Sequence, residues 1–136
     1  MQRPIVDTHP QKVRVAEVPP ADDHSEEDGW MNMAVQWVIT RARGGAEKTV
    51  FGITTFPPGG RHDIHRHPHA EEVEYLIEGR GIARVGDTDV RMEPGDVVVA
   101  KAGEAHGFWN TSETERAVLM QSTDREATLQ NSSNIY

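Results

Sequence analysis

The sequence predicts an all-β domain, and two observations support this fold class. Short runs rich in β-branched and aromatic residues recur between turn signals, a spacing typical of sandwiches and barrels. No stretch of about twelve residues shows a convincing helical periodicity. The chain has 136 residues, about the commonest size for one domain with a single core.

The expected strands are short and follow one another along the chain. The residues from 31 to 40 are an apolar run typical of a buried strand, and those from 72 to 78 alternate between two faces. Gly86-Asp87 and Pro94-Gly95 are turn signals, since glycine supplies a positive φ. The expected strands are 12–18, 31–40, 47–56, 72–79, 81–85, 89–92, 96–101 and 116–122.

Three segments are expected along the chain. Residues 1–30 contain an N-terminal strand and an acidic, proline-bearing loop, which packs on the barrel or exchanges within a dimer. Residues 31–122 form the barrel. Residues 123–136 are polar and form a C-terminal tail.

Composition excludes several classes of partner. The net charge of −8 opposes binding to phosphate backbones, so nucleic acid is not expected as a partner. No apolar run approaches the roughly 18 residues that span a membrane, and the N-terminus lacks the apolar stretch of a signal peptide. With no cysteine, the chain has neither disulfides nor thiol catalysis. A soluble cytoplasmic protein is therefore expected.

Four residues form a candidate metal site: His65, His67, Glu72 and His106. Histidines two apart on an extended strand point to the same face. Imidazole nitrogens and a carboxylate oxygen suit one divalent transition metal, namely Fe, Mn, Ni, Cu or Zn. Alternatively, these are solvated loop histidines, or the four histidines from 62 to 69 form a nonspecific metal-binding tract.

The spacing of these residues resembles the signature of the cupin superfamily. Its first block has Gly, five residues, His-x-His, three or four residues, Glu, six residues and Gly, which fits 59–79. Its second block fits Gly95, Gly103, His106 and Asn110, but Lys101 stands where the family usually has proline. The resemblance implies a small single-domain protein with a double-stranded β-helix (jelly-roll) barrel and a metal held by the four residues above.

Alternation along 72–78 places Glu74 on the same inward face as Glu72. One interpretation is a catalytic acid or base beside the metal; the other is a structural charge paired with Arg61, Arg66 or Arg84. The opposite face, Val73, Tyr75 and Ile77, is apolar and needs a cover. Small cupins often pair back to back, so the resemblance implies a homodimer.

Other residues near the motif are assigned by position. Phe108 lies two residues after His106, shares its face and is the candidate substrate-binding residue. Strand parity favours Glu72 over Glu71 as the carboxylate ligand. His62 and His69 are interpreted as surface groups or as groups that support the ligands.

The resemblance implies a metal-dependent enzyme that acts on a small oxygenated molecule. A dioxygenase using molecular oxygen is the first interpretation. The alternatives are a non-redox isomerase, cyclase or lyase acting on a sugar or keto acid, and a ligand-binding module without turnover.

Overall fold

The computed structural model describes residues 2–21 and 30–125; the side chains of Trp30 and Met31 are not described. The expected acidic loop and C-terminal tail therefore lie largely outside the described residues. Within the described ranges, no helix is long and apolar enough to cross a membrane.

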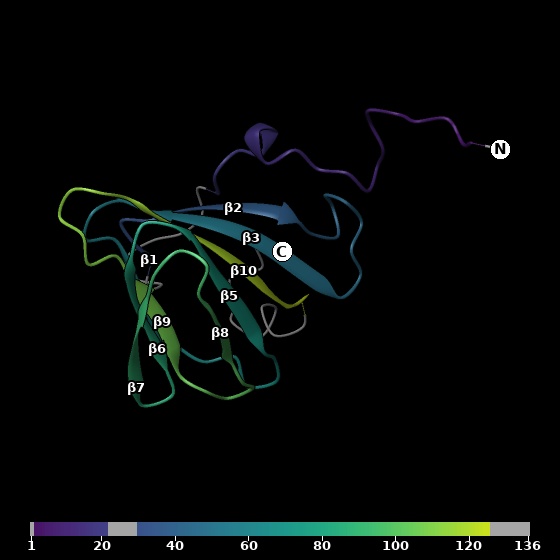
Figure 1. Cartoon of the computed structure of the whole chain (residues 1–136). Coiled ribbons are helices and arrows are strands. Elements are labelled where there is room, and N and C mark those ends of the chain that lie inside the picture. The colour runs from purple at the N-terminus through teal and green to yellow at the C-terminus, as the bar shows by residue number, and fades with distance from the viewer. Residues whose placement is uncertain (1, 22–29, 126–136) are drawn as a thin grey trace.

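Two five-stranded sheets face each other, with antiparallel pairing throughout (Figure 1). The first sheet has the order β1-β4-β9-β6-β7 and the second has the order β2-β3-β10-β5-β8. This arrangement confirms the expected all-β jelly roll. In chain order the strands are β1 (Trp30–Met31), β2 (Ala34–Ile39), β3 (Thr49–Phe56), β4 (Arg61–His65), β5 (Glu72–Glu78), β6 (Gly81–Val85), β7 (Thr88–Met92), β8 (Val97–Ala100), β9 (His106–Trp109) and β10 (Ala117–Asp124).

The expected strand at 12–18 is wrong, because this segment contains a short 3-10 helix, η1 (Val15–Glu17). Its amide groups bond locally, with the amide of Val18 donating to the carbonyl of Val15. The side chain of Gln36 on β2 donates to the carbonyls of Val15 and Val18, at 3.1 and 2.9 Å. The segment is thus held against the edge strand by a side chain and does not extend the sheet.

Other strands also differ from the expected ones. The run at 31–40 is divided between β1 and β2, because Asn32 adopts a positive φ of 52°. Strands β4 and β9 were not among the expected strands. At the other end, β10 continues to Asp124 and so includes the first two residues of the expected tail.

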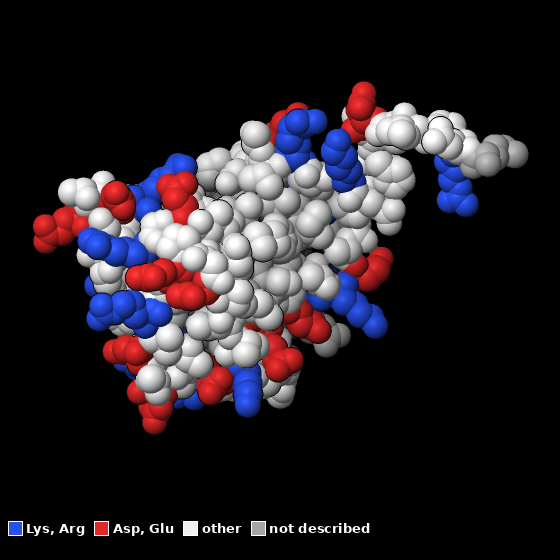
Figure 2. Space-filling view, viewed as in Figure 1, with Lys and Arg blue, Asp and Glu red and all other residues white. Residues whose placement is uncertain are grey.

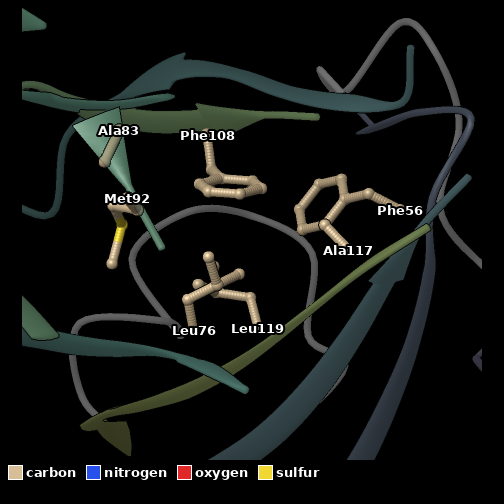
Figure 3. Close-up of a cluster of buried hydrophobic side chains, with 7 residues drawn as sticks. All are labelled: Phe56, Leu76, Ala83, Met92, Phe108, Ala117 and Leu119. Carbon is tan, nitrogen blue, oxygen red and sulfur yellow. The ribbon is translucent and has the colours of Figure 1, made fainter. Parts of the chain in front are cut away.

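One half of the space between the sheets is apolar. Phe56 and Phe108 pack with ring centroids 4.9 Å apart. Figure 3 shows them beside Leu76 and Leu119, between the ribbons of the two sheets. The full buried cluster comprises Phe56, Leu76, Ala83, Met92, Phe108, Ala117 and Leu119.

The other half of the interior carries the buried polar groups of the second sheet, beside a smaller apolar cluster of Val35, Trp37 and Val50. Along β5, the inward positions change from Leu76 to Glu74 and then Glu72. Glu74 lies opposite Gln121 of β10, whose side-chain amide donates to the Thr54 hydroxyl of β3 at 2.8 Å. The buried polar groups of the second sheet therefore lie at the end of β5 that carries Glu72.

Candidate metal centre

Both sheets contribute to the four-residue cluster of His65, His67, Glu72 and His106. His65 ends β4, His67 follows in the loop, Glu72 begins β5 and His106 begins β9. One donor atom from each residue lies within 4.8 Å of the others. A single ion with bonds of about 2.1 Å separates opposite donors by roughly 4.2 Å, so the cluster needs only a small contraction to share one.

The imidazole rings lie close together around the carboxylate of Glu72. The ring centroids of His65, His67 and His106 are 4.1 to 5.0 Å apart. The Nε2 atom of His67 lies 3.6 Å from Oε1 of Glu72, and the Nε2 atom of His106 lies 3.3 Å from Oε2. Only 12% of the Glu72 side chain is exposed. Three nitrogens and a carboxylate thus converge in a largely buried space.

Two of these rings are oriented by backbone carbonyls. Nδ1 of His65 lies 2.8 Å from the carbonyl of Asp63, and Nδ1 of His106 lies 3.1 Å from the carbonyl of Glu104. In the tautomers that donate these hydrogen bonds, each Nε2 carries a lone pair directed into the cluster. Metal-binding histidines are typically fixed in this way by a partner at the second nitrogen.

The buried Nε2 atom of His106 has no aligned hydrogen-bond partner, although it lies beside the Glu72 carboxylate. In the tautomer described above, a lone pair and a carboxylate oxygen face each other there. Two acceptors at this distance repel unless a proton or a metal ion lies between them. The donor set therefore fits a divalent transition metal.

Local electrostatics favour the protonation states of His65 and Glu72 that can bind a metal ion. Burial, followed by the charge of His106, lowers the pKa of His65 to about 4, so its ring is neutral at neutral pH. Burial alone would raise the pKa of Glu72. The facing imidazoles of His106 and His67 outweigh burial and hold this pKa well below its ordinary value.

The same carboxylate raises the pKa of His106, although burial opposes this. In the absence of a metal, His106 is therefore the ring that takes a proton beside Glu72. Metal binding has to displace that proton, since an imidazole nitrogen binds a metal through its lone pair.

Glu74 is buried next to the cluster and hydrogen-bonds to Glu72. Burial, and then the charge of Glu72, raises the pKa of Glu74 well above its ordinary value. Its Oε2 atom has no hydrogen-bond partner. Of the two carboxyl groups, Glu74 is therefore the one that keeps its proton to higher pH, and it can donate that proton to Glu72.

The three arginines that were considered as partners of Glu74 each contact another group. Arg61 and Arg84 pair with Asp63 and Asp89, at 3.0 and 2.6 Å, and Arg66 donates to the Gly103 carbonyl at 2.9 Å.

The remaining candidates occupy different places. Phe108 shares the inward face with His106 but belongs to the apolar cluster and is 1% exposed, so substrate contact stays a prediction for this residue. Glu71 and His69 are exposed and lie outside the four-residue cluster.

His62 was interpreted as a surface or supporting group, and the structure places its ring against that of His65, with centroids 4.1 Å apart. Burial and the neighbouring His65 lower the pKa of His62 well below its ordinary value. Strand periodicity alone gives no signal for this contact, because the two residues are three apart.

Two curated relatives resemble the chain in sequence. An oxalate-binding protein of Thermotoga maritima is 25% identical over 107 residues, which cover 79% of this chain and 88% of the relative. The tetracenomycin polyketide synthase protein TcmJ of Streptomyces glaucescens is 29% identical over 84 residues, or 62% of this chain. The chain spans 56% of the length of TcmJ.

Solved structures share the fold. A predicted oxalate decarboxylase of Thermotoga maritima superposes with a TM-score of 0.71 and 22% identity, over 83% of this chain and 97% of the other. The polyketide cyclase RemF of Streptomyces resistomycificus also has a TM-score of 0.71, with 21% identity over 83% of this chain and 78% of the other.

The family comparison covers the cluster itself. The model of the cupin domain matches residues 52–121, more than half of the chain, and this range contains all four residues of the cluster. Together with the two-sheet jelly roll, this match shows that the chain belongs to the cupin domain family.

Proposed function

We propose that His65, His67, Glu72 and His106 hold one divalent transition metal, and that the centre binds and transforms a small oxygenated organic molecule. The observation that carries this proposal is the buried Nε2 atom of His106, without an aligned hydrogen bond and 3.3 Å from a carboxylate oxygen. A cation between these atoms relieves the repulsion of their lone pairs.

Such a metal supplies a Lewis acid and a template for oxygen ligands and, if it is redox-active, a site for dioxygen. Four protein donors leave about two positions of a six-coordinate ion for the ligand. Within the chain, the oriented rings of His65 and His106 hold the geometry, and Glu72 supplies the negative charge.

Glu74 is the proposed catalytic residue. It is buried beside Glu72, and burial followed by the charge of Glu72 raises its pKa, which favours the protonated form. A neutral carboxyl group in this position can donate its proton to a ligand oxygen and later recover it. This role suits reactions that pass through an enolate.

Two reaction classes remain candidates. Non-redox chemistry, such as cyclisation, isomerisation or elimination, is supported by the proton on Glu74 and by the resemblance to a polyketide cyclase and to TcmJ. The dioxygenase is the second candidate, supported by the three-histidine, one-glutamate donor set alone. A ligand-binding role without turnover is supported by the oxalate-binding relative.

Metal content tests the centre directly. Protein purified without added metal is expected to carry close to one equivalent of a transition metal per chain. His67→Ala should lose most of it, because one of four donors is removed. The matched control His69→Ala removes an exposed imidazole two residues away and should keep it. Equal metal loss in the two variants would indicate a nonspecific histidine tract and contradict the proposal.

Reaction class is tested by turnover of the metal-loaded protein. Oxygen-electrode assays with catechols, diketones and flavonols measure dioxygenase activity. Anaerobic assays with polyketide-like diketones, read by product mass, measure cyclisation or isomerisation. Glu74→Gln should slow the non-redox reaction about 100-fold or more, since it removes the transferable proton. Full activity in this variant would exclude the proposed role of Glu74.

The apolar outward face of the second sheet supports a homodimer. Tyr75 lies opposite Val97, and Val73 lies opposite Val99, on neighbouring strands. These residues and Ile77 are between 37% and 54% exposed. A second copy of the same sheet would cover them. In the view of Figure 2, charged side chains gather around the margin, and uncharged ones fill the centre, over β3, β10 and β5.

A further inference from the structure

Strand β4 has a β-bulge where it pairs with β9, because it carries one extra residue there. The bulge lies beside the four-residue cluster. His62 pairs with Phe108 and His65 pairs with His106, so three steps along β4 match two steps along β9. Residues three apart on a regular strand would face opposite sides of the sheet. The extra residue returns His62 to the inward side, which its partner Phe108 also faces.

Gly107 on β9 accommodates the bulge. A Cβ atom at this position would lie 3.0 Å from the carbonyl oxygen of His62 and 3.2 Å from Cα of Ile64. Both distances are shorter than ordinary van der Waals contact, so a larger residue would push the bulge away from β9. The glycine between the inward residues His106 and Phe108 therefore lets the two strands approach.

The bulge supplies two contacts to the ring of His65. The carbonyl of Asp63 accepts a hydrogen bond from Nδ1 at 2.8 Å. The ring of His62 lies against the ring of His65 with centroids 4.1 Å apart and planes inclined by 31°, close to a stacked arrangement. The hydrogen bond fixes the Nδ1 edge of the His65 ring, and the tilted ring of His62 covers one of its faces. Together these contacts direct Nε2 of His65 into the cluster.

We propose that His62 is a positioning residue of the metal centre, which fixes the ring plane of His65 by packing against it. This inference rests on the metal site proposed above and adds a fourth imidazole, that of His62, as a packing partner. Among the described residues, the donors that come within 4.8 Å of one another belong to the other four side chains. Bulges beside functional sites commonly re-aim a side chain in this way.

The test uses Cu(II) added to metal-free protein, with affinity from a competing chelator and geometry from electron paramagnetic resonance. His62→Phe keeps a flat ring on His65 and should match the wild type in both measurements. His62→Ala removes the ring and should weaken Cu(II) binding on the order of tenfold, the size typical of lost support for a ligand. It should also change the g and copper hyperfine values. His69→Ala is the control and should match the wild type.

Gly107→Ala provides an independent route, because it displaces the bulge while His62 remains. It should produce a spectral change similar to that of His62→Ala. This variant answers the question if His62→Ala does not fold, which thermal unfolding of each metal-free variant will show.

The outcomes separate the possibilities. The positioning role would be overturned if His62→Ala had the Cu(II) affinity and spectrum of the wild type. If His62→Ala does not fold, the same result in Gly107→Ala would overturn it. A nitrogen hyperfine pattern with one coupled nitrogen fewer in His62→Phe would also overturn it, because His62 would then be a ligand. If wild-type protein binds Cu(II) no better than His65→Ala, the metal site itself is wrong. If the wild type binds Cu(II) and His62→Ala binds it equally well, the positioning role is rejected and the proposed metal site is not.

Discussion

At the scale of single residues, Glu72 and Glu74 show how one strand presents two carboxyl groups in opposite protonation states. Both face inward from β5, two residues apart. The imidazoles beside Glu72 lower its pKa, whereas burial and the charge of Glu72 raise the pKa of Glu74. In active sites, two neighbouring groups whose pKa values diverge in this way often serve as the acid and the base.

The raised pKa of Glu74 predicts a pH-dependent gain in stability for Glu74→Gln in metal-free protein. The folded protein keeps a proton that the unfolded chain releases above its ordinary pKa of 4.5, so wild-type stability falls as pH rises through this window. Glutamine does not titrate. At about pH 7.5, the variant should therefore unfold at a higher temperature than the wild type. This difference in unfolding temperature should vanish as the pH falls below about 4.

Glu78→Gln is the matched control, since Glu78 is on the same strand but exposed and paired with Arg116 at 2.8 Å. Its pKa is lowered by that pairing, so the sign is reversed: any effect is a slight loss of stability that disappears in acid. Scanning calorimetry of the three proteins across this pH range measures both effects. A pH-independent difference between Glu74→Gln and wild type would contradict the raised pKa.

At the scale of elements, Asn110 joins three parts of the barrel at the end of β9. Its side-chain amide donates to the carbonyls of Phe56, Pro57 and Glu115, at 3.0, 3.2 and 2.7 Å. Its oxygen accepts from the amide of Ser112 at 2.9 Å. The side chain thus fixes the end of β3 to the connection between β9 and β10, as a structural role inferred from turn chemistry predicts.

Asn110→Ala should destabilise the protein by about 3 kcal/mol, because several buried backbone groups lose their partner. The expected fall in melting temperature is roughly 10 °C for a domain of this size. Asn110→Asp should be nearly as unstable, since it keeps the acceptor but loses the donors. Thr111→Ala, at the exposed neighbouring position, is the control and should change little. A loss below about 1 kcal/mol in Asn110→Ala would contradict the structural role.

The elements also show where sequence reasoning succeeds. Strands β5, β6 and β10 were predicted from alternation and β-branched residues. The choice of Glu72 over Glu71 as the candidate carboxylate ligand followed from the alternation of side chains along the strand. Strands β4 and β9 lack that composition, because histidine, aspartate and glycine replace β-forming residues where the cluster is built. The contact of His62 with His65 depends on a bulge, which shifts the register and which periodicity cannot show.

At the scale of the whole molecule, the two faces of the second sheet differ in chemical character. Its inward face carries Glu72 and part of the core, whereas its outward face carries exposed valine, tyrosine and isoleucine side chains on β5 and β8. Exposed apolar rows of this kind mark interaction surfaces. Alternation on β5 predicts this row.

The proposed homodimer predicts a response to charge on this face. Ile77→Lys combined with Val97→Lys should raise the dimer dissociation constant at least about 100-fold, because burying unpaired charges opposes association. Thr88→Lys, exposed on the first sheet, is the control and should leave the mass unchanged. Sedimentation equilibrium at micromolar concentration measures all three proteins. A wild-type protein that sediments as a monomer would exclude the dimer.

The transition from apolar to polar inward residues along β5 has a consequence for how this scaffold can change. Leu76, in the apolar half, and Glu72 are four residues apart on one strand, a separation of about 13 Å. Groups so far apart contribute nearly independently to folding free energy. A substitution at Glu72 should therefore alter the proposed metal site while the cluster around Leu76 still packs, so this end of β5 can change without compensating mutations there.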